Sequence, residues 1–168
     1  DGAVERLDSE IESIRRSTQA DLETVAPSER YLRVQEGRSR TFDLLLTKQM
    51  IQQGAAQGAS AEATLRELLE LRPEDPFAQN SLAYLLAVEG RSLDNAEALV
   101  LRALEQRPFS GAFLDTLAWV YFRQGRLEEA SETIDAALHL LPDDEELLGH
   151  RARIREVMES PRRNPAML

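Results

Sequence analysis

The stretch "LDTLAWVYFRQGRLEEA", residues 114–130, decides the fold. It joins a run of large apolar residues to a glycine, a charged turn and an alanine. Gly125 has the character of a residue that ends a helix, because glycine adopts the left-handed backbone conformation at little cost. The stretch therefore predicts the end of one helix, a tight turn and the start of a second helix.

This pattern occurs twice in the chain. Residues 76–108 and residues 111–142 both read as helix, glycine turn, helix and proline. The matched pairs are Leu82 and Leu117, Ala83 and Ala118, Gly90 and Gly125, Ala96 and Ala130, Ala103 and Ala137, and Pro108 and Pro142. The offset changes by one residue within the turn, where an insertion costs least. A helical hairpin of about 34 residues cannot bury its apolar face alone, so we expect the copies to stack.

These residues resemble the tetratricopeptide repeat (TPR) family, whose pattern has Leu-Gly, an aromatic, a Gly, two Ala and a Pro. Residues 76–142 match it specifically, although Ala replaces the first Gly in both copies. Residues 42–73 match it weakly, because Lys48 and Gln49 stand where Leu-Gly is expected. The resemblance implies an all-α, right-handed α-solenoid of antiparallel helix hairpins. The sequence of the two clear repeats also resembles the terminal repeats of larger bacterial TPR proteins, many of which are exported or lipid-anchored adaptors.

The predicted organisation adds a helix at each end of the solenoid. It comprises an N-terminal amphipathic helix (1–26), a degenerate TPR-like helix pair (28–75), two TPR repeats (76–109 and 110–143), a C-terminal capping helix (144–160) and a tail (161–168). Ser28 and Ser60 are candidate N-caps. Gly37 interrupts the helical pattern of the second segment, which weakens the prediction of one continuous helix there. Asp143 and Asp144 are suited to cap the last helix, and the Arg residues along that helix keep a terminal cap solvated.

The N-terminal segment carries a narrow apolar stripe. Val4, Leu7, Ile11 and Ile14 follow one another at spacings of three and four, as on one face of a helix. The stripe is too short for a coiled coil, which needs three to four heptads. It either packs on the rest of the chain or serves as an oligomer interface, and the sequence leaves both readings open.

Composition narrows the class of protein. The chain of 168 residues is 42% hydrophobic and has a net charge of −10, from 20 Lys and Arg against 30 Asp and Glu. This acidity disfavours binding to nucleic acid. The absence of cysteine excludes disulfides and thiol chemistry, and no apolar stretch approaches the ~20 residues of a membrane span. The chain begins at Asp1, so it is read as a fragment or a mature form, and the compartment stays open between cytoplasmic and periplasmic or exported.

No catalytic constellation is found in the sequence. The two histidines, His139 and His150, lack the spacing of a zinc motif, and no turn presents a nucleophile. The acidic run from Asp143 to Glu146 lacks the alternating ligands of a calcium loop and suits a helix start better. We therefore expect no enzyme activity, no cofactor and no metal site.

In TPR proteins the first helix of each pair lines a concave groove that binds partners. Carried residue by residue onto this sequence, the resemblance implies a partner-binding groove at Asn80, Tyr84, Asp115, Trp119, Phe122, Arg123, His150 and Arg153. Exposed Tyr, Trp and Arg are enriched at binding hot spots. The alternative for Trp119 is that it packs against the next helix pair. Tyr121 stands at a packing position of the repeat and is predicted to lie in the core.

These observations favour a protein-interaction module, an adaptor or scaffold, that binds a protein or peptide segment in the groove. The alternative is a structural module that self-associates as a homo-oligomer, with residues 1–26 as the interface. Neither nucleic-acid binding nor membrane insertion by this chain is expected.

Overall fold

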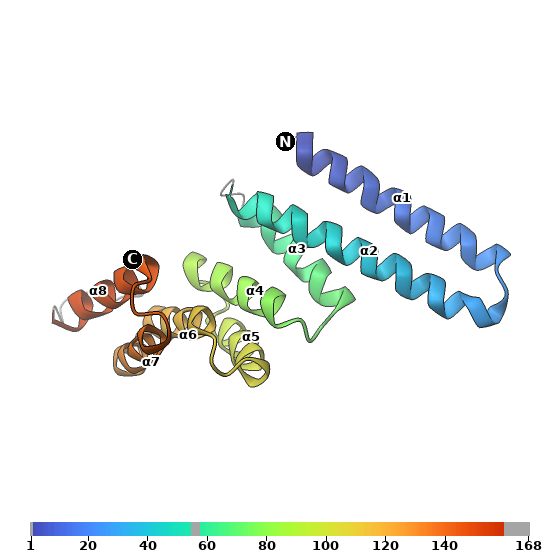
Figure 1. The fold of residues 1–168 in the computed structure, drawn as a ribbon. Coiled ribbons are helices and arrows are strands. Elements are labelled where there is room, and N and C mark those ends of the chain that lie inside the picture. Colours follow the sequence, from blue (N-terminus) through green and yellow to red (C-terminus); the bar gives the residue numbers. More distant parts are fainter. Residues whose placement is uncertain (1, 55–57, 160–168) are drawn as a thin grey trace. The chain divides into compact units, whose positions relative to one another are not determined.

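The computed structural model describes residues 2–54 and 58–159, and all regular secondary structure in these residues is α-helical (Figure 1). The elements are α1 (Gly2–Thr24), α2 (Pro27–Gly54), α3 (Gly58–Leu71), α4 (Pro76–Glu89), α5 (Leu93–Gln106), α6 (Gly111–Gln124), α7 (Leu127–Leu140) and α8 (Glu145–Glu159). They form two compact units, Asp1–Pro73 and Glu74–Leu168. The predicted all-α fold of stacked helix hairpins is confirmed.

In the first unit, α1 and α2 form a long antiparallel hairpin. Lys48 Nζ lies 2.5 Å from Asp8 Oδ1, and Gly37 faces Thr18, so the partners run in opposite directions along the two helices. A Cβ atom at Gly37 would lie 2.3 Å from Thr18 Oγ1. Helix α2 continues through Gly37, and the glycine suits this position because the two helices approach closely there.

The apolar stripe of α1 faces its own chain. Ile11 and Ile14 are buried in the hairpin, with α2 as the principal neighbour of α1, while Val4 and Leu7 are half-buried. The reading of the stripe as a packing face is thus the one that these contacts favour. An interface with a second copy would have to use the remaining exposed surface.

The core of the first unit lies between α2 and α3, where the fully buried side chains are large and aliphatic or aromatic. They include Phe42, Leu45, Leu65 and Leu68. The guanidinium of Arg72 lies 3.8 Å from the centre of the Phe42 ring and covers this core at its edge. Two predicted caps are wrong. Ser28 lies inside α2, which begins at Pro27 because proline suits the first helical position, and Ser60 lies inside α3.

The second unit repeats one hairpin design. Helices α4, α5, α6 and α7 each have 14 residues. Asp75 accepts a hydrogen bond from Ala78 N and Ser110 accepts one from Phe113 N, so each hairpin begins with a side-chain cap. Gly90 and Gly125 end the first helices with φ of 68° and 80°. The matched alanines pack at the helix crossings with no exposed surface: Ala83, Ala118, Ala96, Ala130, Ala103 and Ala137.

The two hairpin turns differ by one residue, Ser92. Gly90 and Arg91 match Gly125 and Arg126, and the second helix of each pair then starts at a leucine. Ser92 stands between them in the left-handed region, with φ of 50°, and its side chain makes no capping hydrogen bond to the part of the chain that the structure describes. The inserted residue is thus accommodated by local backbone strain rather than by a shift of α5.

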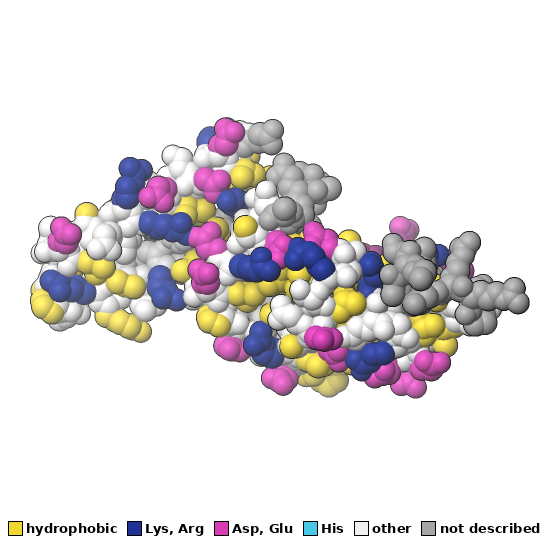
Figure 2. Space-filling model, turned by 180° about the vertical axis from the view of Figure 1, so that it is seen from behind, with side chains coloured by type: hydrophobic (Ala, Val, Ile, Leu, Met, Phe, Trp, Pro, Cys, Tyr) yellow, Lys and Arg dark blue, Asp and Glu magenta, His cyan; other side chains and the backbone are white. Residues whose placement is uncertain are grey.

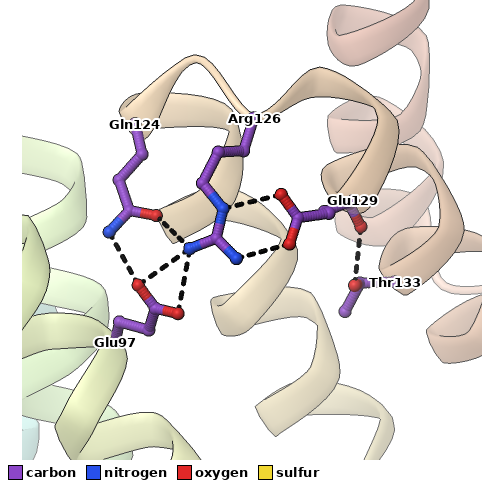
Figure 3. A network of polar contacts seen from close by, with 5 residues as sticks. All are labelled: Glu97, Gln124, Arg126, Glu129 and Thr133. Carbon is purple, nitrogen blue, oxygen red and sulfur yellow. Dashed lines mark hydrogen bonds and ion pairs between the residues drawn. The ribbon is translucent and has the colours of Figure 1, made fainter.

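An arginine in the second turn ties the two repeats together (Figure 3). Arg126 Nη1 donates to Glu97 of α5 at 2.9 Å, and Arg126 Nε donates to Glu129 of α7 at 2.7 Å. The hydrogen bonds from Arg126 lower the pKa of Glu129. The same guanidinium lies 4.0 Å from the centre of the Tyr121 ring. Tyr121 is consequently half-buried under Arg126 rather than fully in the core, which corrects its prediction.

Helix α8 packs on α6 and α7 as a further first helix. Asp144 Oδ1 accepts hydrogen bonds from the backbone N–H groups of Glu146 and Leu147, which identifies Asp144 as its cap. Leu147, Ile154 and Val157 join the core that α6 and α7 form. The predicted tail, 161–168, lies outside the described residues. Within residues 2–54 and 58–159, no helix has the length and hydropathy that a bilayer span requires.

Candidate functional site

The first helices of the second unit form one layer. Helix α4 contacts α6 and α6 contacts α8, whereas α5 and α7 make no comparable contact with each other within the described residues (Figure 1). Elements on the inner side of a curved stack lie closer together than those on the outer side. We therefore take the shared surface of α4, α6 and α8 as the inner face of the repeats.

Tyr84 crosses this inner face from α4 to α8. Its hydroxyl donates a hydrogen bond of 2.9 Å to Glu146 Oε1, 62 residues further along the chain. Partial burial, the hydrogen bond to Glu146, and the charges of Glu146 and Asp115 raise the pKa of Tyr84 well above its usual range. The phenol therefore stays protonated and keeps donating across the ordinary pH range, so the contact holds α8 to α4 over the surface of α6.

Beneath this contact, Asp115 of α6 pairs with His150 of α8. Asp115 Oδ1 lies 2.7 Å from His150 Nδ1, and their side chains are 7% and 15% exposed. The His150 ring stacks on Trp119, with 4.3 Å between the ring centres, and Trp119 stacks in turn on Phe122 at 4.8 Å. The Trp119 ring is therefore stacked between the rings of His150 and Phe122 and is half-buried. This agrees with the alternative prediction that Trp119 packs against the next helix.

Two predicted groove residues are not available at the surface. Asp115 is 5% exposed and Phe122 is 3% exposed. Phe122 lies in the core with Ile134 and Leu147, because the ring of Trp119 covers it. Asp115 lies under His150. Both side chains are covered by residues of the inner face and support them, which corrects the expectation that Asp115 and Phe122 line an open groove.

The two predicted arginines have local partners. Arg123 Nη1 donates 2.9 Å to the backbone carbonyl of Val88, so it caps the end of α4. Arg153 pairs with Glu156 one turn further along α8, at 2.5 Å. Both side chains are half-exposed, and Arg153 stays on the inner helix layer. Asn80 is half-buried, and its Oδ1 is buried with no hydrogen-bond partner within the described residues.

The structure thus brings together Tyr84, Asp115, Trp119 and His150, and adds Glu146. Sequence reasoning assigned Glu146 only to the start of a helix. The repeat offset could have found it, because 34 residues separate Glu146 from Ala112, which stands one turn before the predicted groove residue Asp115 on α6. Hydrogen bonds and ring stacking position this cluster of polar and aromatic side chains. Three of its members, Asp115, Glu146 and His150, are of the types that bind metal ions.

Charges elsewhere on the surface are mixed. On the face drawn in Figure 2, Lys and Arg side chains and Asp and Glu side chains are both spread over the surface, and hydrophobic side chains are scattered among them. Several apolar residues of the second unit are nevertheless well exposed. Phe109 is 85% exposed in the turn between the repeats, and Phe77 is 50% exposed at the start of α4.

Comparison with known proteins gives a consistent family. Two tetratricopeptide repeat profiles match residues 87–154 and 52–111. A TPR repeat-containing protein of Pseudomonas aeruginosa is 32% identical over 115 residues, which are 67% of this chain and 20% of that protein. The chain thus spans about a fifth of that relative's length.

Solved structures share the fold at low identity. A tetratricopeptide repeat protein from Parabacteroides merdae superposes with a TM-score of 0.62 at 16% identity, covering 95% of this chain and 75% of that one. An O-GlcNAc transferase mutant from Thermobaculum terrenum superposes with a TM-score of 0.65 at 21% identity, covering 70% of this chain and 22% of that one. At these identities the likeness concerns the fold alone.

Proposed function

The chain belongs to the tetratricopeptide repeat family, and we therefore propose that it is a non-enzymatic protein-interaction module. TPR repeats generally mediate contacts between proteins. The finer proposal is that a segment of another protein binds along the inner face of α4, α6 and α8. The chain would then act as an adaptor or scaffold.

The observation that carries this proposal is the convergence of polar and aromatic side chains from three helices on one face. Tyr84, Glu146 and His150 meet there without entering the apolar core. Tyr and Arg are over-represented among residues that dominate binding energies, and Arg153 extends the same surface along α8. Buried Asp115 and Phe122 hold this surface in place, so it is ordered before a partner arrives, which lowers the entropy cost of binding.

The residues that suit a partner best are polar residues of the inner face that are partly exposed. Asn80 lies on α4 and Arg153 on α8, the two helices that flank α6 in the inner layer, and both side chains are half-exposed. An amide and a guanidinium can bond backbone carbonyls or carboxylates of an extended segment. A segment that lies across α6 would meet both of them.

Replacement of Asn80 and Arg153 by Ala tests this proposal. We expect the double variant to retain its melting temperature and to bind partner proteins from an extract of the source cells about tenfold more weakly, which is ~1.4 kcal/mol. Arg102→Ala, an exposed change on α5, is the matched control and should bind as the wild type does. Unchanged capture by the double variant, or loss of capture by Arg102→Ala, contradicts binding at the inner face.

Self-association is the second candidate, and the exposed apolar residues of the first unit favour it. Tyr31 and Met50 of α2 are 75% and 70% exposed, while Val4 and Leu7 of α1 are half-buried. A second copy would cover exposed apolar residues of α2 such as these. Light scattering of the whole chain should give twice the chain mass if it does, and Met50→Glu, at a residue that is exposed in the single copy, should restore the single mass. A single mass for the wild type at high concentration contradicts self-association.

A further inference from the structure

Three potential metal ligands converge between α6 and α8. Glu146 and His150 stand four residues apart on α8 and therefore share one face of the helix, and Asp115 faces them from α6. One ligand atom from each of the three side chains lies within 4.8 Å of the other two. Atoms bound to one zinc ion at bond lengths of about 2.0–2.2 Å lie about 3–4 Å apart. Rotation of the side chains would bring all three onto one ion, and the hydrogen bond of 2.7 Å between Asp115 and His150 would then be exchanged for bonds to the metal.

Neighbouring side chains orient these ligands. The Tyr84 hydroxyl donates to Glu146 Oε1 at 2.9 Å, and the Trp119 ring stacks on His150 at 4.3 Å. Hydrogen bonds to metal-binding carboxylates and contacts that fix imidazole rings are usual around metal sites, where they hold the ligands ready. The side chains of Asp115 and His150 are also largely withdrawn from water.

The charges of this cluster favour a cation, and one hydrogen-bond donor in the cluster lacks an acceptor among the described residues. Two carboxylates, Asp115 and Glu146, lie together with a single imidazole, and a divalent ion would balance both negative charges. In addition, Trp119 Nε1 is a buried donor with no acceptor among the described residues.

We propose that Asp115, Glu146 and His150 bind a divalent transition-metal ion of the zinc class. One imidazole nitrogen with two carboxylate oxygens suits Zn²⁺, Co²⁺ or Ni²⁺, whereas Ca²⁺ and Mg²⁺ prefer oxygen ligands alone. The fourth position falls to water, because the three side chains supply three ligands. The sequence concealed the site because Asp115 lies 31 residues before Glu146 and meets it only when the repeats stack.

An ion at this position would join α8 to α6. It would stabilise the capping helix and hold the inner face in one shape, since its ligands come from both helices. This role is independent of any partner, so the site can be tested apart from the proposed function. Because the ligands must be deprotonated, binding should weaken in acid.

The test is metal titration of the tag-free chain, with Zn²⁺ for calorimetry and Ni²⁺ for fluorescence. Trp119 is the sole tryptophan of the sequence and stacks on His150, so bound Ni²⁺ should quench the tryptophan emission. We expect one Zn²⁺ per chain, a rise in Tm of several degrees with Zn²⁺ and its reversal by a chelator. Asp115→Asn, Glu146→Gln and His150→Ala should each weaken binding at least tenfold.

Two matched controls distinguish binding at this site from nonspecific metal binding to other surface side chains. His139→Ala removes the other histidine, exposed on α7, and Glu145→Gln removes the neighbouring exposed carboxylate. Both variants should bind Zn²⁺ as the wild type does. The proposal is overturned if the wild type shows no saturable binding, if binding survives in Asp115→Asn and His150→Ala, or if His139→Ala abolishes it. Circular dichroism of each variant confirms that a loss of binding is not a loss of folding.

Discussion

The two repeats of the second unit share a frame but present different inner faces. Their helices have equal lengths, the same left-handed glycines and alanines at the same crossings. At equivalent inner positions, however, Tyr84 of α4 corresponds to Trp119 of α6, and Asn80 corresponds to Asp115. The tyrosine reaches across to Glu146, whereas the tryptophan stacks between two rings.

This difference shows which positions the fold constrains. Positions at the helix crossings accept only small residues, because the backbones approach closely there. Inner-face positions tolerate a change of ring type and polarity, since each side chain finds its own partner on the next first helix. The frame therefore determines stability, and the inner face is where recognition can diverge between otherwise similar repeats.

The largest expected effect is on the core of the second repeat. Ile134 is fully buried among α6, α7 and α8, and Ile134→Ala should lower the free energy of unfolding by about 2–5 kcal/mol. Its equivalent in the first repeat is Val100, also fully buried, and Val100→Ala should cost less because fewer methyl groups are lost. Urea unfolding measures both. Leu101→Ala, at an exposed neighbour, should stay within about 0.5 kcal/mol, and a comparable loss there would refute the shared frame.

A second comparison concerns the glycines that end α4 and α6. Gly90→Ala and Gly125→Ala should each cost about 1–2 kcal/mol, because both residues have positive φ. Gly90→Ala should cost more, since its Cβ would lie 2.2 Å from Arg123 Nη2 and displace the arginine that bonds the Val88 carbonyl. The excess should vanish in an Arg123→Ala background. Equal losses in the wild-type background contradict this reading of Arg123.

The inner faces should also differ in their response to alkali. Burial and the bond to Glu146 raise the pKa of Tyr84, so the stability it contributes is complete below its unfolded pKa of about 10 and is lost as pH rises above that value. Tyr84→Phe should cost about 0.5–1.5 kcal/mol near neutral pH and flatten the alkaline loss. Trp119→Phe, at the equivalent position, should keep the wild-type slope. Unfolding free energies measured at several alkaline pH values test this prediction. If the free energy falls with pH equally steeply in both variants, Tyr84 does not cause the alkaline loss of stability.

The smallest expected effect concerns the turn. Ser92 holds φ of 50° in the turn that is one residue longer, and Ser92→Gly should relieve this strain. The gain in unfolding free energy should be at most about 1 kcal/mol, because glycine also loses more entropy on folding. A thermal melt measures it against Ser131→Gly, a mid-helix change in α7 that should destabilise. Destabilisation by Ser92→Gly would mean that the serine side chain has an unrecognised role.

Much of the second unit could be predicted from residue type and spacing. Gly90, Gly125 and the matched alanines act through local backbone geometry and close packing, which the sequence carries directly. Gly37 shows the limit of such reasoning, because a glycine in a helix signals either a break or a close approach, and only the position of Thr18 distinguishes the two.

The candidate site could be predicted only in part. The repeat placed Tyr84, Trp119 and His150 on one face, but their exposure depends on contacts between distant residues. Asp115 is buried because His150 covers it, and Trp119 packs because His150 and Phe122 stack on it. Such pairings between helices are set by side-chain directions that spacing does not specify.

Photo-cross-linking of the bound partner tests the central claim most directly, the claim that the inner face is the binding surface. A photoreactive benzoylphenylalanine at Gly149 of α8 faces open space, because no atom of the described residues outside its own helix backbone and chain neighbours lies within 4 Å of an added Cβ there. The same residue at Leu101 of α5 marks the outer layer. The account predicts partner adducts from position 149 and few from position 101. Adducts from position 101 with none from position 149, while capture persists, would contradict it.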